Sequence, residues 1–142
     1  MKVERATEAT DELVEAFTRL LPQLAPGRSA PTLGELDAAV SAPGTTVLVA
    51  RDGDAIVGTL TLLLYRIPSG LRGWIHDVVV DESSRGQGAG AALVDEAMRL
   101  AEAAGVASVH LTARAHREAA HRMYRRLGFV EHPSQVFVWR PE

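Results

Sequence analysis

The sequence predicts a mixed α/β fold in which helices flank one mixed β-sheet. Two hydrophobic patterns support this: short segments that alternate apolar and polar residues, typical of half-buried strands, and longer segments with helical spacing. Their order along the chain is β-α-α-β-β-β-α-β-α-β-β. The 142 residues suffice for one hydrophobic core, so we expect a single domain over residues 1–142.

The first part of the chain predicts one strand and two helices. Residues 2–7 alternate as a strand does, and Thr10 or Asp11 is suited to cap the helix that follows. Pro22 is expected to stop that helix, and a short second helix is predicted over residues 33–40. The buried face of the first helix would be formed by Leu13, Phe17, Leu20 and Leu21.

Three consecutive antiparallel strands follow. Residues 45–65 contain two apolar or β-branched runs that meet at Asp52-Gly53, a favoured hairpin turn. Residues 74–80 form the third strand. A helix that Gly105 ends comes next, and the strand at 106–113 should lie parallel to 74–80, because parallel strands need a crossover of that length.

The last part of the chain predicts a helix and a closing hairpin. Residues 117–127 have amphipathic helical spacing, and Gly128 is placed to end that helix. Residues 129–130 and 135–140 are expected to pair as the last two strands.

Composition excludes several classes of function. The net charge of −3 argues against a nucleic-acid-binding protein, and the absence of cysteine excludes disulfides, thiolate metal sites and a cysteine nucleophile. The charged N-terminal segment does not resemble a signal peptide, and no apolar run approaches the roughly 18 residues of a membrane span. The histidines show no metal-ligand spacing. We therefore expect a cytoplasmic protein with no metal and no nucleic-acid or membrane partner.

Three glycines two residues apart, Gly86, Gly88 and Gly90, mark the start of the third predicted helix. Glycine is a poor helix former, so its presence there indicates a backbone that another molecule approaches closely. Backbone N–H groups at the positive end of a helix suit a phosphate, and Arg85 stands beside them. A glycine-rich turn without a ligand is the alternative.

Other nucleotide-binding motifs fit these glycines poorly. The residues Gly86-x-Gly88-x-x-Ala91 match the letters of a dinucleotide-binding fingerprint, but "DESSR" separates them from their strand. The acidic residue expected about 20 positions later is missing from "VHLTAR". A P-loop is excluded because the chain has no Gly-Lys-Ser/Thr.

The stretch instead resembles the pyrophosphate loop of the GNAT superfamily of N-acetyltransferases, whose pattern is Arg/Gln-x-x-Gly-x-Gly/Ala. Arg85, Gly88 and Gly90 match it, and "AHRMYRRLGF" at 120–129 resembles the second signature of the family. The resemblance implies acetyl-CoA as cosubstrate, with its pyrophosphate on the amides from Gln87 to Ala91. The coenzyme-binding residues that it implies are Val78, Val79, Val80, Arg85, Gly86, Gln87, Gly88, Ala89, Gly90 and Ala91.

Acetyl transfer to an amine needs a base and an acid. A free amine has a pKa near 10 and is mostly protonated at neutral pH, and the leaving thiolate must gain a proton. The family resemblance gives the acid role to Tyr124, for which a buried structural tyrosine is the alternative. His76 is a competent base, although many relatives are acidic at its position and a hydrogen-bonded structural histidine is an equal interpretation. Asp77 is the second choice.

Strand alternation predicts the surroundings of these residues. It places Trp74, His76, Val78 and Val80 on one face of the strand and Ile75, Asp77 and Val79 on the other. A backbone N–H near Val78 would hold the thioester carbonyl oxygen, as the family resemblance implies.

The function implied is transfer of an acetyl group from acetyl-CoA to a primary amine of a small molecule or peptide, by direct attack in a ternary complex. A non-catalytic acyl-CoA-binding or sensing module on the same fold is the alternative, since His76 departs from the family pattern. A donor with a longer acyl chain is a third interpretation. The resemblance also implies a possible homodimer, and it leaves the acceptor open.

Overall fold

The computed structural model describes residues 1–141, which divide into two compact units, residues 1–112 and the chain from Ala113 onward. The first unit contains one mixed five-stranded sheet and three α-helices, so the predicted fold class is confirmed for it. The prediction of a single domain over the whole chain stays a prediction.

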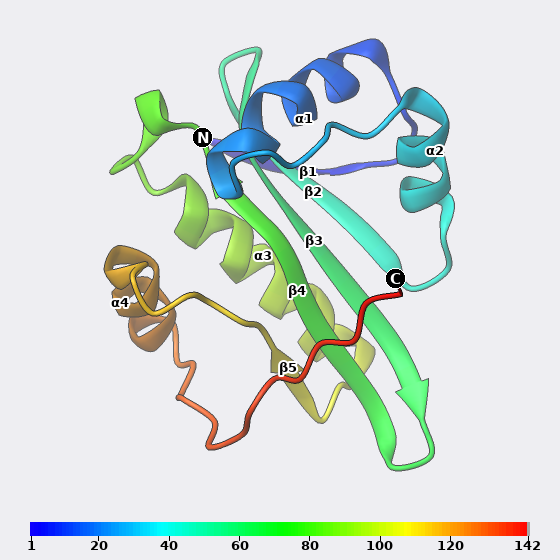
Figure 1. Ribbon diagram of the computed structural model, residues 1–142, viewed down its shortest axis with the longest axis vertical. Coiled ribbons are helices and arrows are strands. Elements are labelled where there is room, and N and C mark those ends of the chain that lie inside the picture. Colours follow the sequence, from blue (N-terminus) through cyan, green and yellow to red (C-terminus); the bar gives the residue numbers. More distant parts are fainter. Residues whose placement is uncertain (142) are drawn as a thin grey trace. The chain divides into compact units, whose positions relative to one another are not determined.

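The sheet of the first unit has its strands in chain order, β1-β2-β3-β4-β5 (Figure 1). The first four strands pair antiparallel, and β4 pairs with β5 in parallel, which confirms the predicted crossover. The fifth strand is much shorter than the predicted 106–113. The strands are β1 (Lys2–Ala6), β2 (Thr45–Asp52), β3 (Ala55–Ile67), β4 (Gly70–Val80) and β5 (Ser108–His110).

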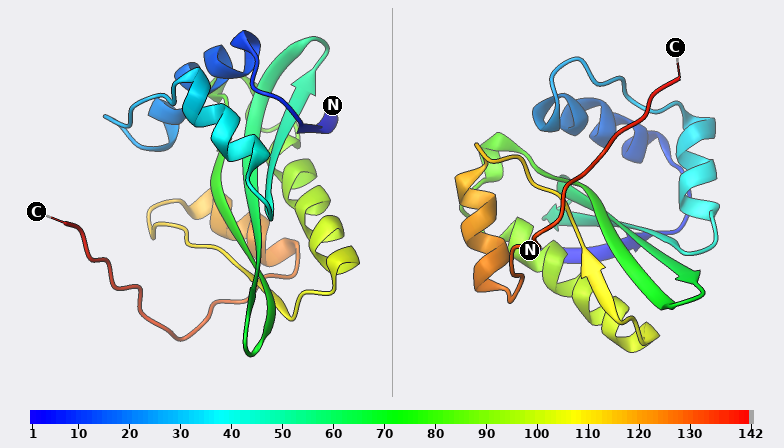
Figure 2. Two further views of the ribbon diagram at one scale, coloured as in Figure 1. Left: turned by 90° about the vertical axis from the view of Figure 1, so that its right-hand side faces the viewer. Right: turned by 60° about the horizontal axis from the view of Figure 1, so that its bottom comes forward.

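Two helices cover one face of this sheet and a third covers the other (Figure 2). Helices α1 (Asp11–Leu24) and α2 (Leu33–Ser41) share the first face, and α3 (Ala89–Ala104) lies on the second. The Thr10 hydroxyl accepts a hydrogen bond from the Leu13 N–H and starts α1. Thr32 starts α2 as part of a capping box.

Pro22 does not stop α1, contrary to the sequence prediction. The helix continues to Leu24, and the Ala25 N–H closes it on the Leu21 carbonyl at 3.1 Å. Pro22 removes only the one intrahelical bond that its own N–H would make, and just two helical residues follow it. Leu20 and Leu21 beside it are buried, and their packing on the sheet holds the last turn.

The hydrophobic core lies on both faces of the sheet. Under α1, Leu13, Phe17 and Leu20 pack with Val49 and Val79. Between the other face of the sheet and α3, the buried side chains include Leu48, Leu60 and Leu62 of the sheet and Leu93 and Val94 of α3. The sheet is therefore packed between two helical layers, and β4 is the strand next to the β5 edge.

Within the described part of the second unit, the one helix is α4 (Glu118–Arg126), and Gly128 follows its C-cap, Leu127, with a φ of 99°. The predicted closing hairpin is wrong: residues 129–141 contain no strand, and Phe137 and Trp139 are 92% and 82% exposed. An apolar alternation becomes a strand only where its backbone groups find a partner ladder. Pro133 lacks an N–H to offer to such a ladder, and the Ser134 N–H instead bonds locally to the His132 carbonyl.

Candidate active site

A β-bulge interrupts β4 in its second half. Val79 pairs with Thr59 and His76 pairs with Thr61, so two residues, Asp77 and Val78, stand opposite the single residue between those threonines. Asp77 takes a left-handed conformation with a φ of 52°, which is uncommon for a residue other than glycine. Such conformations persist only where the surrounding fold enforces them, and they concentrate at functional sites.

The bulge corrects the predicted alternation of β4. One extra residue moves all later side chains to the opposite face of a strand. Val79, expected opposite His76, shares its face and is buried under α1. Val80 lies on the other side, where its methyl group borders the same space above Gly58 as Leu93 of α3.

The pairing between β4 and β5 is very short. Only residues 72–74 of β4 pair with β5, so within the described chain the β5-facing edge of β4 has no partner strand from Ile75 to Val80. An unpaired strand edge exposes a row of backbone N–H and C=O groups. A molecule with amide groups along its length is suited to bind such an edge.

The end of this free edge leads into the glycine-rich loop. A short 3₁₀ helix, Glu82–Ser84, follows β4, and the exposed residues 85–88 then lead to α3. Gly88 is the N-cap of α3 and offers no side chain, and the first helical bond joins the Ala92 N–H to the Gly88 carbonyl. The N–H groups of the first helical turn, from Ala89 on, therefore point outward from the positive end of the helix.

The reason for the glycines differs in part from the prediction. Gly86 and Gly88 have φ values of 82° and 87°, a region that side chains disfavour. A Cβ at either position would meet nothing within 4 Å, so no part of the protein crowds them. The glycines are required by the turn, and the space beside them is open to a ligand.

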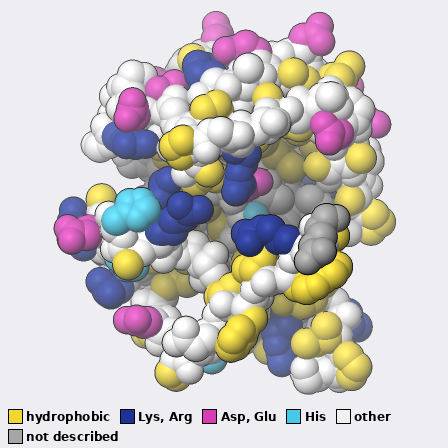
Figure 3. Space-filling model, in the orientation of Figure 1, with side chains coloured by type: hydrophobic (Ala, Val, Ile, Leu, Met, Phe, Trp, Pro, Cys, Tyr) yellow, Lys and Arg dark blue, Asp and Glu magenta, His cyan; other side chains and the backbone are white. Residues whose placement is uncertain are grey.

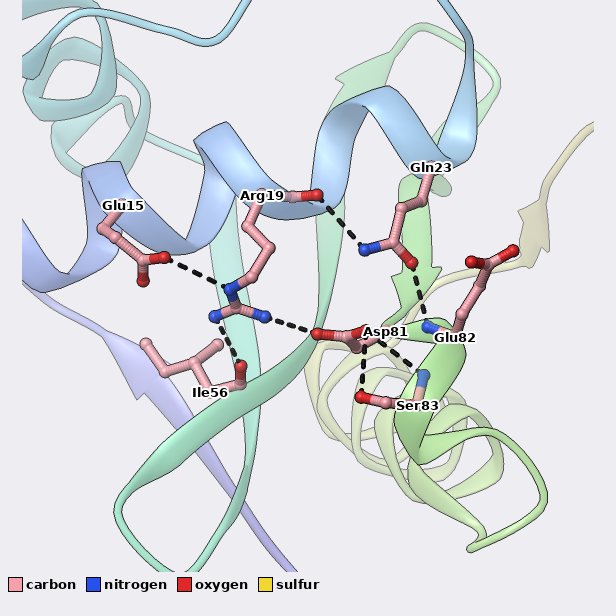
Figure 4. A network of polar contacts seen from close by, with 7 residues as sticks. All are labelled: Glu15, Arg19, Gln23, Ile56, Asp81, Glu82 and Ser83. Atoms are coloured by element: carbon pink, nitrogen blue, oxygen red, sulfur yellow. Dashed lines mark hydrogen bonds and ion pairs between the residues drawn. The ribbon is translucent and has the colours of Figure 1, made fainter.

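A polar network fixes the base of this loop to α1 (Figure 4). Arg19 donates to the Asp81 carboxylate at 2.7 Å and to the Ile56 carbonyl at 3.0 Å. The Glu82 N–H donates to the side-chain oxygen of Gln23 at 2.9 Å. The pKa of Asp81 is lowered, first by the hydrogen bond from the Ser83 backbone N–H and then by Arg19. The start of the loop is thus held by the polar side of α1.

A second arginine reaches the bulge from the segment between α1 and α2. The Arg28 guanidinium lies 3.2 Å from the Asp77 carboxylate, and the two side chains are 47% and 39% exposed. Sequence analysis found neither Arg19 nor Arg28. Their partners are 62 and 49 residues away in the chain, and no local pattern signals such a pairing.

Three aromatic rings form a column on the face of the sheet that α1 and α2 share. Trp74 stacks on His110 of β5 with ring centres 5.4 Å apart, and on His76 with ring centres 6.1 Å apart. Trp74 and His76 do share a face, as predicted. His76 is exposed, next to Asp77 and the bulge.

Tyr124 belongs to the second unit and is 9% exposed. Its ring makes an edge contact with Phe129, and the Phe129 N–H bonds to the Tyr124 carbonyl at 2.9 Å. Burial raises the pKa of the phenol above its ordinary value, with a smaller opposing effect from Arg117. The hydroxyl is therefore protonated at neutral pH.

The predicted site residues thus fall into two groups. The first unit brings together His76, Asp77 and Val78 at the bulge, while Val79 and Val80 lead from there to the loop at 85–91. Tyr124 lies in the second unit. Among residues 1–141, no group of three or more His, Asp or Glu side chains is arranged to hold a metal ion. Within the same range, no helix has both the length and the apolar character that crossing a membrane requires.

Solved structures resemble this chain over nearly its whole length. A protein of Agrobacterium tumefaciens str. C58, assigned as an acetyltransferase, is 26% identical with a TM-score of 0.83, and the match covers 99% of this chain and 100% of that one. An aminoglycoside acetyltransferase from an uncultured soil metagenomic sample, in complex with sisomicin, is 22% identical with a TM-score of 0.85, covering 99% and 96% of the two chains.

A third structure, ribosomal-protein-alanine N-acetyltransferase from Brucella melitensis biovar Abortus 2308, is 21% identical with a TM-score of 0.77 and covers 99% of both chains. At these identities the second and third structures establish the fold alone. No curated protein gives a significant match to the sequence. The family model described as "Acetyltransferase (GNAT) family" matches residues 8–129. Since that match spans most of the sequence, the chain belongs to the GNAT family of acetyltransferases.

Proposed function

We propose that the protein is an N-acetyltransferase that moves the acetyl group of acetyl-CoA to a primary amine. The observation that carries this proposal is the continuity of two features: the free, bulged edge of β4 and the open glycine-rich loop at the N-terminus of α3. Together they offer an elongated backbone surface that ends at an anion site.

The residues of the loop fit the phosphates of a coenzyme A thioester. The amides from Gln87 to Ala91 would hold the pyrophosphate, because helix N-termini bind anions through their N–H groups and dipole. Arg85 is exposed beside them and adds a positive charge; its contact to Glu82 is 4.0 Å long. The peptide-like arm of the coenzyme would lie along the backbone of residues 78–80, and the open space beside Gly86 and Gly88 gives the phosphates room.

The acetyl group would then lie at the bulge. A backbone N–H near Val78 would polarise the thioester carbonyl, as preorganised donors do in acyl transfer. The base that takes the ammonium proton would be His76 or Asp77, either directly or through a water. Tyr124, protonated at neutral pH, would return a proton to the leaving thiolate, whose ordinary pKa is about 8.5. The amine attacks directly, so no acyl-enzyme is formed.

The proposed acceptor is defined only as a primary amine. The aminoglycoside and ribosomal-protein acetyltransferases that share the fold act on a small molecule and on a protein, as their names state. Both classes are compatible with a primary amine as nucleophile.

The experiment that tests the proposal is thermal melting with acetyl-CoA, CoA and NAD, each in large excess. A ligand at about a hundred times its Kd adds roughly 2.7 kcal/mol, which raises the melting temperature of a chain of this size by several degrees. We expect a shift with acetyl-CoA and CoA and none with NAD. Release of the CoA thiol in the presence of amines then tests the transfer itself.

Two results would contradict the proposal. No shift with either CoA ligand would show that the loop does not bind the coenzyme. A shift without thiol release from any amine would instead support an acyl-CoA-binding module. Where transfer occurs, pH–rate profiles of His76→Gln and Asp77→Asn identify the base, since only loss of the base removes the ionisation on which the rate depends.

A further inference from the structure

The Arg28–Asp77 pair is placed where an acceptor amine would arrive. Asp77 forms the bulge whose neighbouring amide would hold the thioester carbonyl, so a nucleophile must come within reach of this carboxylate. Arg28 comes from the segment between α1 and α2 and meets Asp77 at 3.2 Å. Both charges are substantially exposed, and exposed pairs contribute little to stability, so opening the pair costs little.

The pair also changes the electrostatics of the site. An acceptor with several ammonium groups requires several free carboxylates. On the first unit, Asp77 is paired with Arg28, and the side chains that share the face of His76 on β4 and β5 include Trp74, His110 and the basic Arg72. On the face drawn in Figure 3, most Asp and Glu side chains lie in the upper part, others lie at the left and lower left, and the centre is occupied mainly by Lys and Arg. Among these described residues of β4 and β5, the carboxylate offered to a polycation is that of Asp77, which Arg28 already occupies.

An ion pair that opens easily matches a ligand that carries both charges. A zwitterion can place its ammonium on Asp77 and its carboxylate on Arg28, and each protein charge then exchanges one partner for another. A carboxylate and a guanidinium can form two parallel hydrogen bonds, which would also fix the orientation of the acceptor. An α-amino acid carries its two charges as close neighbours, as the protein pair does.

The aromatic column supplies a surface for the rest of such a molecule. His76 is adjacent to Asp77 and exposed, and its ring stacks on Trp74, which in turn stacks on His110. Planar groups pack favourably against such rings in offset or edge contacts. An acceptor anchored at Asp77 by its ammonium can extend a planar side chain over this column.

We propose that the acceptor is a free α-amino acid with a planar side chain, bound by exchange of the Arg28–Asp77 ion pair. This rests on the proposed function, because the acetyl donor is acetyl-CoA. The ammonium loses one proton to the base, its nitrogen forms a bond to the acetyl carbon, and the carbon–sulfur bond breaks. The nitrogen then gives up a second proton to become the amide, the thiolate takes a proton from the acid, and that second proton restores the acid. The products are the N-acetyl amino acid and free CoA.

The test compares L-tryptophan with tryptamine, the same amine without the carboxylate. Rates of CoA thiol release are measured for both acceptors and for L-alanine and spermidine, with the full chain and acetyl-CoA. We expect kcat/KM for L-tryptophan to exceed that for tryptamine, L-alanine and spermidine by at least tenfold. In Arg28→Ala the preference for L-tryptophan over tryptamine should fall to less than threefold, and Arg28→Lys should keep part of it.

The matched control is Arg99→Ala, which removes an exposed arginine paired with Glu96 on α3. It should keep the full preference. A wild-type preference for tryptamine or spermidine, or a preference that Arg28→Ala leaves intact, would overturn the inference. Equal rates for L-alanine and L-tryptophan would overturn the planar side chain as part of it.

The failure of this inference is distinguishable from the failure of the proposed function. If acetyl-CoA raises the melting temperature and tryptamine is acetylated while amino acids are not, only the inference fails. If no amine reacts, L-tryptophan is added to the CoA-bound protein and melting is measured. A further rise that Arg28→Ala abolishes supports the acceptor site, and its absence overturns it.

Discussion

The phenol of Tyr124 provides the sharpest test at the scale of single residues. Tyr124→Phe keeps the buried ring and its contact with Phe129 and removes only the ionisable hydroxyl. If this hydroxyl protonates the leaving thiolate, kcat should fall at least tenfold while the rise in melting temperature with acetyl-CoA stays the same. Steady-state kinetics together with thermal melting measure both quantities.

The other tyrosine of the chain offers the matched control. Tyr65 lies in β3 and is partly exposed, and Tyr65→Phe should leave kcat close to the wild-type value. An unchanged kcat in Tyr124→Phe would show that this tyrosine is structural. A loss of coenzyme binding in the same variant would show that the ring, rather than the proton, had been disturbed.

Residue identity also explains what sequence reasoning found and missed in the site. His76, Asp77 and the glycines stand in short local patterns that a single sequence displays. The left-handed Asp77 is different, because aspartate gives no sign that it occupies a conformation which glycine usually takes. The bulge there reversed the predicted faces of Val79 and Val80, and it could be located only from the pairing of β4 with β3.

Helix α3 carries the next prediction, at the scale of elements. It is bounded by two left-handed glycines, Gly88 at its N-cap and Gly105 at its C-cap, with φ values of 87° and 83°. Neither has an atom within 4 Å of the position that a Cβ would take. Substitution by alanine should therefore cost about the same at both ends, roughly 1–2 kcal/mol for a left-handed residue.

Substitutions at the two ends of α3 should differ in their effect on coenzyme binding. Gly88→Ala disturbs the turn that aims the first N–H groups of α3, so the rise in melting temperature with acetyl-CoA should shrink by at least half. Gly105→Ala should lower the melting temperature of the free protein to a similar extent and keep the full rise. Equal rises in the two variants would exclude the N-terminus of α3 as the phosphate site.

Elements with local signals were predicted well, and elements that depend on distant partners were not. The hairpin at Asp52-Gly53 and the start of α1 capped by Thr10 follow from short sequence motifs, and both are present. The closing strands were expected from an apolar alternation alone, and residues 129–141 show that alternation does not supply a partner. Arg19 was similarly invisible, because its bond to Asp81 depends on how α1 lies on the sheet.

At the scale of the whole molecule, charge pairs link elements that are distant in sequence. Arg51 of β2 pairs with Glu4 of β1 and lies 2.7 Å from the Glu12 carboxylate of α1. Hydrogen bonds from this guanidinium lower the pKa of both glutamates below their ordinary value. The same arginine therefore connects the edge strand, its neighbour and the first helix.

These lowered pKa values predict how stability responds to acid. A carboxylate whose pKa is lower in the folded state than in the unfolded state stabilises the fold above the unfolded pKa of about 4.3, and that contribution is lost as the pH falls through the folded pKa. Melting temperature should thus be nearly constant from pH 7 to about 5 and decline steeply below about 4.5.

Arg51→Met should lower the melting temperature at pH 7 and make the acid decline shallower, because the two glutamates then have nearly ordinary pKa values. Arg66→Met, at the exposed end of β3, should leave the slope unchanged, and a slope equally steep in Arg51→Met would show that other carboxylates govern unfolding in acid.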